Sequence, residues 1–108
     1  HCGAVRLKVK TDLAQVITCN CSMCSRAGTM LTFVPVDQFT LESGEESLSN
    51  YRFNKKVIDH LFCKKCGIKA FGRGKGRDGK PTIAVNIRCL DDFDQLKVEP
   101  MQYNGKSI

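Results

Sequence analysis

The feature that most constrains this chain is a cluster of three cysteines within six residues, Cys19-Asn20-Cys21-Ser22-Met23-Cys24. If the chain is extended as far as Cys21, the side chains of Cys19 and Cys21 share one face of a strand, with Cα atoms roughly 6.5 Å apart. A turn over the next two residues then brings Cys24 back as a third sulfur. Cysteine thiolates bind zinc at about 2.3 Å, so the cluster is a candidate zinc site.

This cluster supplies three sulfur ligands, and no fourth ligand is close in the sequence. Structural zinc sites are closed by four protein ligands, whereas catalytic sites keep one position for water or substrate. We therefore interpret Cys19, Cys21 and Cys24 as the ligands of a catalytic zinc. Buried thiols, disulfides and redox chemistry are the alternatives, and the close spacing of the cysteines favours metal over them.

A second cysteine pair has the spacing Cys63-x-x-Cys66 and is followed by a glycine, which lets the backbone turn toward the sulfurs. Two cysteines cannot complete a tetrahedral structural site, and Cys2 is unassigned. We therefore group Cys2, Cys63 and Cys66 around a second, structural zinc. A thioredoxin-like redox motif is the alternative, but that motif begins a helix, and residues 68–71 are typical of a strand.

Two further residues resemble metal ligands by type. His60 lies three residues before Cys63 and faces away from it on an alternating strand, so we expect a hydrogen-bonded structural histidine. Cys89 has no cysteine nearby, which favours a buried small side chain over a ligand.

Two polar residues interrupt the last apolar run of the chain. The side-chain amide of Asn86 needs hydrogen-bond partners there, and we expect Asn86 to line a pocket or to hold a neighbouring loop by hydrogen bonds. Arg88 is a candidate partner for a carboxylate, either that of Asp91 or Asp92 or one on a substrate.

Alternating apolar and polar residues predict a mainly β chain. Val5, Leu7 and Val9 alternate with basic residues, which is typical of a half-buried strand. Further short runs of β character occupy residues 16–18, 29–34, 39–41, 51–53, 68–71 and 82–89. No stretch keeps a helical period for more than two turns. With 108 residues, the chain is expected to form a single domain, residues 1–108, around one core.

Two connecting segments receive specific predictions. Residues 25–28 are expected to form a tight return in which Gly28 supplies a positive φ. The chain from Asp91 onward, including Tyr103-Asn104-Gly105, is expected to finish as a turn on the surface.

The most basic segment is the glycine-rich stretch 72–81, in a chain of formal net charge +6. It matches the glycine spacing of dinucleotide-binding and phosphate-binding loops, but a strand-like run follows it instead of a helix, and Pro81 removes a backbone amide. We expect a hairpin connection there. The alternative is a loop that attracts an anionic substrate through its basic side chains, Arg73, Lys75, Arg77 and Lys80.

The cysteine count also bears on the compartment. Seven cysteines, an odd number without the spacing of a secreted disulfide scaffold, favour a reducing environment. No run approaches the ~20 apolar residues of a membrane span, and no segment resembles a secretory signal. We therefore expect a cytoplasmic protein without a membrane partner.

Four motifs spread over nearly the whole chain carry a family resemblance. They are His1-Cys2-Gly3-Ala4-Val5, Cys19-Asn20-Cys21-Ser22-Met23-Cys24, His60-Leu61-Phe62-Cys63-Lys64-Lys65-Cys66-Gly67 and Val85-Asn86-Ile87-Arg88-Cys89-Leu90. In order and spacing they resemble the glutathione-dependent formaldehyde-activating (GFA) family. The resemblance implies a mainly β, Mss-like fold of several coiled antiparallel sheets stapled by two zinc ions, one structural and one catalytic.

The resemblance also implies roles for the cysteines. Cys19, Cys21 and Cys24 match the catalytic ligands of the family, and the structural set includes Cys2, Cys63 and Cys66. The family pattern begins Cys-x-Cys-Gly, and the cysteine that would precede His1 is absent from this sequence. We interpret this as a trimmed terminus and expect the fourth structural ligand just before His1; otherwise His1, its amine or water would fill that place.

The activity that the resemblance implies is that of a zinc-dependent carbon–sulfur lyase. Such an enzyme activates the thiol of glutathione for addition to formaldehyde, giving S-hydroxymethylglutathione, or performs a related thiol–aldehyde reaction. The alternative is a non-catalytic, zinc-stabilised module that binds nucleic acid or protein through residues 73–80, since the same domain resembles part of centromere protein V. Two tyrosines and no tryptophan offer few surfaces for base stacking, which disfavours nucleic acid.

Overall fold

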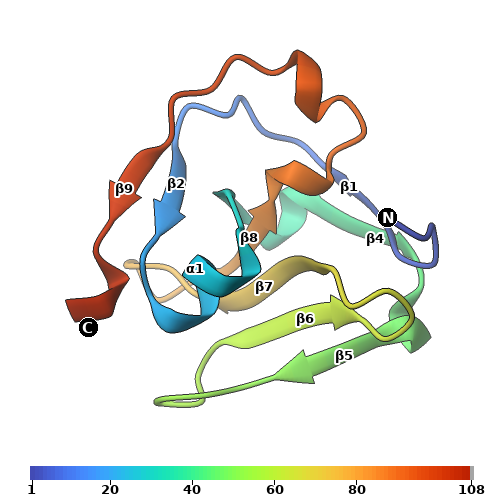
Figure 1. Ribbon diagram of the computed structural model, residues 1–108, viewed down its shortest axis with the longest axis horizontal. Coiled ribbons are helices and arrows are strands. Elements are labelled where there is room, and N and C mark those ends of the chain that lie inside the picture. Colours follow the sequence, from blue (N-terminus) through green and yellow to red (C-terminus); the bar gives the residue numbers. More distant parts are fainter. Residues whose placement is uncertain (108) are drawn as a thin grey trace.

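The computed structural model describes residues 1–107, apart from the side chain of Gln95 (Figure 1). The strands, in chain order, are β1 (Arg6–Val9), β2 (Val16–Cys19), β3 (Leu31–Pro35), β4 (Phe39–Ser43), β5 (Leu48–Tyr51), β6 (Asp59–Cys63), β7 (Lys69–Lys75), β8 (Pro81–Asn86) and β9 (Met101–Tyr103). A single α-helix in this range, α1, spans Ser22–Ala27. Short 3-10 helices occupy Val36–Gln38, Glu45–Ser47, Ile87–Cys89, Phe93–Gln95 and Gly105–Ser107. The predicted mainly β class is confirmed.

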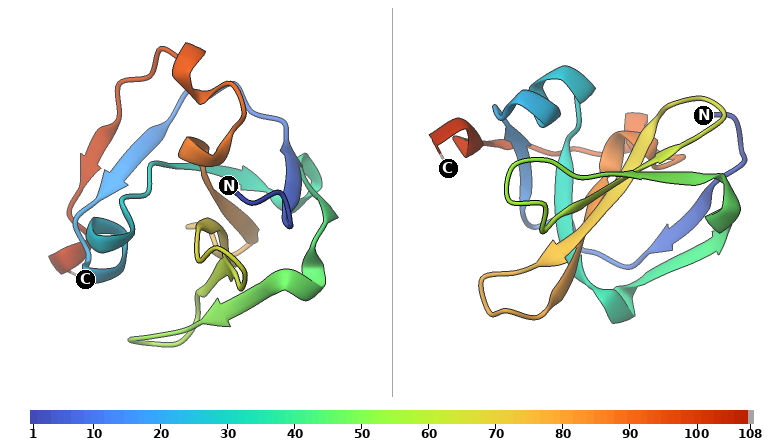
Figure 2. Two further views of the ribbon diagram at one scale, coloured as in Figure 1. Left: turned by 45° about the vertical axis from the view of Figure 1, so that its right-hand side comes forward. Right: turned by 90° about the horizontal axis from the view of Figure 1, so that it is seen from below.

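Seven strands form one sheet in the order β5-β6-β7-β8-β3-β2-β9. Neighbouring strands in it are antiparallel except β2 and β9, which run parallel. Strands β1 and β4 form a separate antiparallel pair. The parallel pair is the exception to the expected antiparallel arrangement, and it brings the end of the chain beside the strand that finishes at Cys19 (Figures 1 and 2).

The main core lies between the β1–β4 pair and the centre of the large sheet. Its buried members are Val34, Leu61, Ala70, Phe71, Ile83 and Val85. Leu7 and Val9, which alternation predicted to share one face, pack against this cluster. Each fully buried apolar side chain contributes about 1.5–3 kcal/mol relative to an exposed one, so this cluster is a main source of stability.

A β-bulge interrupts the pairing of β6 and β7. Leu61 pairs with Phe71, but the next residue of β6, Phe62, pairs with Lys69 instead of Ala70. Paired residues of neighbouring strands share a face, and successive residues of a strand alternate. Because Ala70 is an extra residue, Lys69 lies on the face opposite to Phe71 and outside the main core.

Residues 22–27 form the helix α1, and the prediction of a tight return at 25–28 was wrong in this respect. Cys21 caps the helix, since its sulfur accepts a hydrogen bond from the Cys24 amide at 3.3 Å. Gly28 ends the helix with φ 69°, as predicted, and its amide donates to the Cys24 carbonyl. None of the described helices is long and apolar enough to cross a membrane.

The basic glycine-rich segment forms a hairpin, as expected, but most of it belongs to strands. Strand β7 continues to Lys75, and β8 begins at Pro81. The turn itself is closed by a hydrogen bond from the Gly76 amide to the Lys80 carbonyl at 2.9 Å. Gly79 has φ 78°, a conformation that glycine adopts without strain.

Candidate metal centres

The first cysteine trio, Cys19, Cys21 and Cys24, is assembled where β2 meets α1. Cys19 is the last residue of β2, Cys21 is the N-cap of α1, and Cys24 lies in the first turn of the helix. The three sulfurs lie within 4.8 Å of one another, and no other described histidine, cysteine or carboxylate joins the group. The three sulfurs are therefore brought together by a helical turn. The sequence analysis expected a simple reversal of the chain at this point and missed the helix.

The electrostatics of this trio favour a bound cation. Burial raises the pKa of the Cys24 thiol to about 11. Burial also acts to raise the pKa of Cys21, but hydrogen bonds from the backbone and side chain of Cys24 outweigh it and lower the pKa below its ordinary value. A set of three thiolates so close together is unfavourable without a positive charge between them. Sulfur donors at this spacing fit a zinc ion, because zinc binds cysteine thiolates and stabilises their deprotonated form.

One side of the trio is apolar. Ile17, Cys24 and Leu31 form a small buried cluster, and Cys19, Cys21 and Ala84 pack against it. This cluster fixes the base of the trio through contacts with β2, β3 and β8. The sulfurs therefore sit on a rigid support formed by the large sheet.

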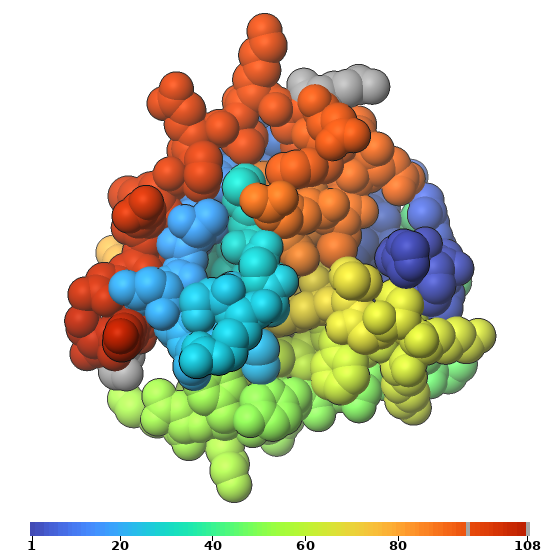
Figure 3. Space-filling model, in the orientation of Figure 1, coloured from blue at the N-terminus to red at the C-terminus, as the bar shows by residue number. Residues whose placement is uncertain are grey.

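The other side of the trio is bounded by the C-terminal segment 103–106, which lies beside the β2–α1 junction (Figure 3). The Asn20 amide donates to the Tyr103 carbonyl at 3.1 Å. The Asn20 side chain donates to Asn104 Oδ1 at 2.8 Å and accepts from the Lys106 amide at 2.9 Å. At Gly105 the segment approaches so closely that a Cβ atom there would overlap the sulfur of Cys19.

A depression opens beside Cys19 between β2, α1 and β9, with a volume of about 500 Å³. Most of the residues that line it carry a hydroxyl or amide group, and they are Thr18, Cys19, Asn20, Ser25, Gln102, Tyr103 and Asn104. Side-chain amides and hydroxyls of this kind form hydrogen bonds with peptide groups and carboxylates. The trio therefore borders a site that suits a small polar molecule.

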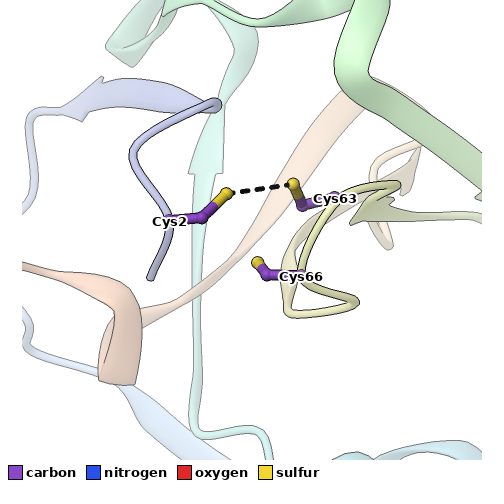
Figure 4. A group of neighbouring side chains, drawn as sticks. All are labelled: Cys2, Cys63 and Cys66. Atoms are coloured by element: carbon purple, nitrogen blue, oxygen red, sulfur yellow. Dashed lines mark hydrogen bonds between the residues drawn. The ribbon is translucent and has the colours of Figure 1, made fainter.

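The second trio joins the N-terminal segment to the β6–β7 turn (Figure 4). The sulfurs of Cys2, Cys63 and Cys66 lie within 4.8 Å of one another, and those of Cys2 and Cys63 are 3.6 Å apart. The Gly67 amide donates to the Cys63 carbonyl at 2.8 Å, and Gly67 has φ 81°. A hydrogen bond from the Ile68 backbone lowers the pKa of Cys66 to about 7. The sulfur donors again fit zinc, and no fourth ligand is present among the described residues.

The two other candidate ligands belong to neither trio. His60 is buried, and its Nδ1 lies 2.9 Å from Lys69 Nζ, which confirms the predicted structural histidine. Cys89 is half-buried and directs its thiol toward the Lys69 carbonyl at 3.8 Å.

The two polar residues of the last apolar run have different roles. Asn86 holds neighbouring backbone in place, accepting from the Met30 and Arg88 amides and donating to the Lys69 carbonyl at 2.9 Å. Arg88 takes part in none of the described ion pairs, so neither Asp91 nor Asp92 is its partner, and a substrate carboxylate stays a prediction. Asp91 pairs with Arg6 at 3.1 Å, and the Arg88 guanidinium lies over the Phe93 ring at 5.4 Å.

Sequence reasoning missed the residues that surround the first trio. Tyr103, Asn104 and Gly105 lie at the surface, as expected, but the prediction did not include their contacts with Asn20 or the close approach of Gly105 to the Cys19 sulfur. The position of Asn20 between two cysteines was the only local signal. The parallel pairing of β9 with β2 joins residues more than eighty positions apart, and no local pattern reveals such a contact.

Comparison with known proteins decides the family. The model of the family described as glutathione-dependent formaldehyde-activating enzyme matches residues 1–106. The chain belongs to this family. The GFA family is named for using glutathione to activate formaldehyde, so the predicted family is confirmed.

The fold of this GFA-family member is shared by a protein of known structure. A crystal structure of a Rhodobacter sphaeroides protein is 28% identical in sequence, with a TM-score of 0.77. The match covers 94% of this chain and 95% of that one. The architecture described above is therefore similar over nearly the full length of both chains.

Proposed function

We propose that this protein catalyses the reversible addition of glutathione to formaldehyde, giving S-hydroxymethylglutathione, as a carbon–sulfur lyase. Membership of the GFA family supports the substrate pair. The observation that carries the proposal is that the first trio, whose three sulfurs lie within 4.8 Å of one another, borders a depression of about 500 Å³ at Cys19. An incomplete ligand set beside an open depression is typical of a catalytic zinc site.

We assign a catalytic zinc to Cys19, Cys21 and Cys24 and a structural zinc to Cys2, Cys63 and Cys66. A free thiol has a pKa of about 8.5 and is mostly protonated at neutral pH. Zinc bound by the first trio would stabilise the thiolate form of the substrate thiol.

The chain's own residues would orient the reactants. The polar depression beside Cys19 offers amide and hydroxyl groups of Asn20, Ser25 and Gln102 to the peptide groups of a tripeptide thiol. The thiolate sulfur then attacks the formaldehyde carbon, a carbon–sulfur bond forms, and the carbonyl oxygen takes a proton from solvent. The C-terminal segment 103–106 forms one wall of the depression beside Cys19.

Replacement of Cys21 tests this proposal. The Cys21→Ser variant is expected to lose about one equivalent of zinc, to lose glutathione binding and to keep its fold, because Cys21 lies in the first trio only. Zinc content by elemental analysis, glutathione binding by calorimetry and the rate of S-hydroxymethylglutathione formation by exchange NMR measure these effects. Exchange NMR separates the catalysed rate from the spontaneous reaction.

The matched control is Cys89→Ser, since Cys89 is a half-buried cysteine outside both trios. Its zinc content and rate should equal those of the wild type. Retained glutathione binding in Cys21→Ser would contradict the proposal. A wild-type protein that binds two zinc ions but neither binds glutathione nor accelerates the reaction would instead support the non-catalytic binding module.

A further inference from the structure

The first trio creates a charge problem for the proposed reaction. Three cysteine thiolates exceed the charge of one zinc dication, so the loaded site is already negative before a substrate arrives. A substrate thiolate adds a further negative charge and is repelled at short range. The site therefore needs a positive group close to the sulfurs.

The β-bulge at Ala70 determines on which face of the sheet a candidate cation, Lys69, lies. Because Lys69 pairs with Phe62, its side chain leaves the main core and lies on the opposite face of the sheet. Bulges next to active sites commonly redirect a side chain in this way. The same face carries Ala84, which packs against the cluster that contains Cys24, and α1 lies in front of β7 and β8 there (Figure 1).

The end of the Lys69 side chain is held by His60. Lys69 Nζ lies 2.9 Å from His60 Nδ1, and a lysine ammonium can only donate, so the ring nitrogen accepts. His60 is 8% exposed, and the centroid of its ring is 5.1 Å from that of Phe53. The ring is neutral near pH 7, because burial and then the Lys69 charge lower its pKa to about 4. His60 therefore fixes the amine without cancelling its charge.

Lys69 and the sulfur trio lie on the same side of the large sheet, since Lys69 shares its face with Ala84, which packs against the cluster that contains Cys24. The described ion pairs with carboxylates are made by arginines, and Lys69 takes part in none of them. Burial lowers the pKa of Lys69, whereas the charges of Cys24, Cys21 and Cys19 act in the opposite direction. The charge of the trio and the charge of Lys69 therefore stabilise each other.

We propose that Lys69 is the residue that offsets the negative charge of the first trio and so allows a substrate thiolate to bind there, with His60 as its positioning residue. The inference rests on the proposed function. Lys69 does not line the polar depression beside Cys19. It therefore acts on the charge at the sulfurs and not on the carboxylates of glutathione.

The test compares two thiols on the cobalt-substituted protein, in which thiol binding changes the visible absorption. Glutathione carries carboxylates, and 2-mercaptoethanol carries none. Lys69→Met removes the charge and keeps most of the apolar stem, so the unfolding temperature should stay close to that of the wild type. We expect both affinities to fall about tenfold or more, and Lys69→Arg, which keeps the charge, to lose less.

Lys8→Met is the matched control. Lys8 is exposed on β1, in the other sheet, so this variant removes the same charge from the molecule without touching the trio. Its thiol affinities should equal those of the wild type. A second readout needs no thiol: the first equivalent of zinc should pass to a chelator about tenfold faster from Lys69→Met than from Lys8→Met.

Unchanged thiol affinities together with unchanged zinc release in Lys69→Met would overturn the proposal. A loss confined to glutathione would also overturn it, because Lys69 would then be a carboxylate-binding residue. If the wild type binds neither thiol, the proposed function fails, while the comparison of zinc release still decides whether Lys69 offsets the charge of the trio.

Discussion

At the residue scale, His60 links the pH to the stability of the fold. Burial lowers its pKa from 6.5 to about 4, the charge of Lys69 adds to this effect, and Asp59 opposes it. The unfolded chain takes up a proton near pH 6.5, whereas the folded chain resists protonation until about pH 4. The stability associated with this neutral ring is therefore present above pH 6.5 and is lost as the pH falls toward 4.

We expect this loss to be about 1–2 kcal/mol, since each pKa unit corresponds to about 1.4 kcal/mol and solvent screens part of it. The measurement is the free energy of urea unfolding between pH 7.5 and 5.5 for the wild type and for His60→Gln. The glutamine keeps an acceptor for Lys69 but cannot titrate. Both proteins carry the same cysteines, so competition between protons and metal cancels in the comparison; parallel curves would show that His60 contributes nothing.

At the element scale, strand β9 and the segment after it form one wall of the first trio. Parallel pairing with β2 fixes the position of β9 along the trio. The Asn20 side chain holds the following segment by hydrogen bonds to the Asn104 side chain and the Lys106 amide. Gly105 is the point of closest approach, because any Cβ there would overlap the Cys19 sulfur. The C-terminal segment can therefore pack this closely against Cys19 only because residue 105 is a glycine.

Gly105→Ala should accordingly disturb the trio more than the fold. The added methyl group must displace either Cys19 or the C-terminal segment, so we expect about one equivalent of zinc to be lost or bound at least tenfold more weakly. The unfolding temperature should fall by only a few degrees, because the segment lies outside the main core. Zinc titration against a chelator measures the effect.

Lys106→Ala is the neighbouring control. Lys106 makes its hydrogen bond to Asn20 through the backbone amide, which the substitution retains. Its zinc affinity should match the wild type. An unchanged zinc affinity in Gly105→Ala would contradict this prediction, because it would mean that the C-terminal segment moves aside without disturbing Cys19.

The elements also show what sequence could and could not predict. The first trio and the Cys63–Cys66 pair were predictable because their spacing is local, and the strands because alternation is local. Cys2 lies 61 positions from Cys63 and was joined to that pair only because it was unassigned and because the family resemblance implied it. The helix α1 was missed because six residues are too few to show a helical period. The direction of Lys69 could not be predicted, since it depends on one extra residue in the pairing of β6 with β7. The wall at Gly105 depends on a contact between distant segments.

At the scale of the whole molecule, the second trio ties the start of the chain to the β6–β7 turn, across 61 positions of sequence. A structural zinc contributes about 10–16 kcal/mol of apparent binding free energy at pH 7, which is comparable to the total stability of about 5–15 kcal/mol of a small protein. The two trios should therefore differ in what their loss does to the fold.

Cys63→Ser should unfold the protein or lower its unfolding temperature by more than about 10 °C, whereas Cys21→Ser should lower it by a few degrees only. Circular dichroism melts of both variants at equal zinc concentration measure the difference. Adding a strong chelator to the wild type should reproduce the Cys63→Ser melt. Equal melts for the two variants would contradict the division into structural and catalytic sites.

The pairing of β9 with β2 also imposes an order on biosynthesis. Lys106 meets Asn20 across 86 positions, so the ribosome must continue well past the helix before the wall can form. At about 5–20 residues per second, this delay is roughly 4–17 s. During that interval the nascent chain displays Cys19, Cys21 and Cys24 with one flank uncovered, so early metal capture would protect these thiols from oxidation while translation proceeds.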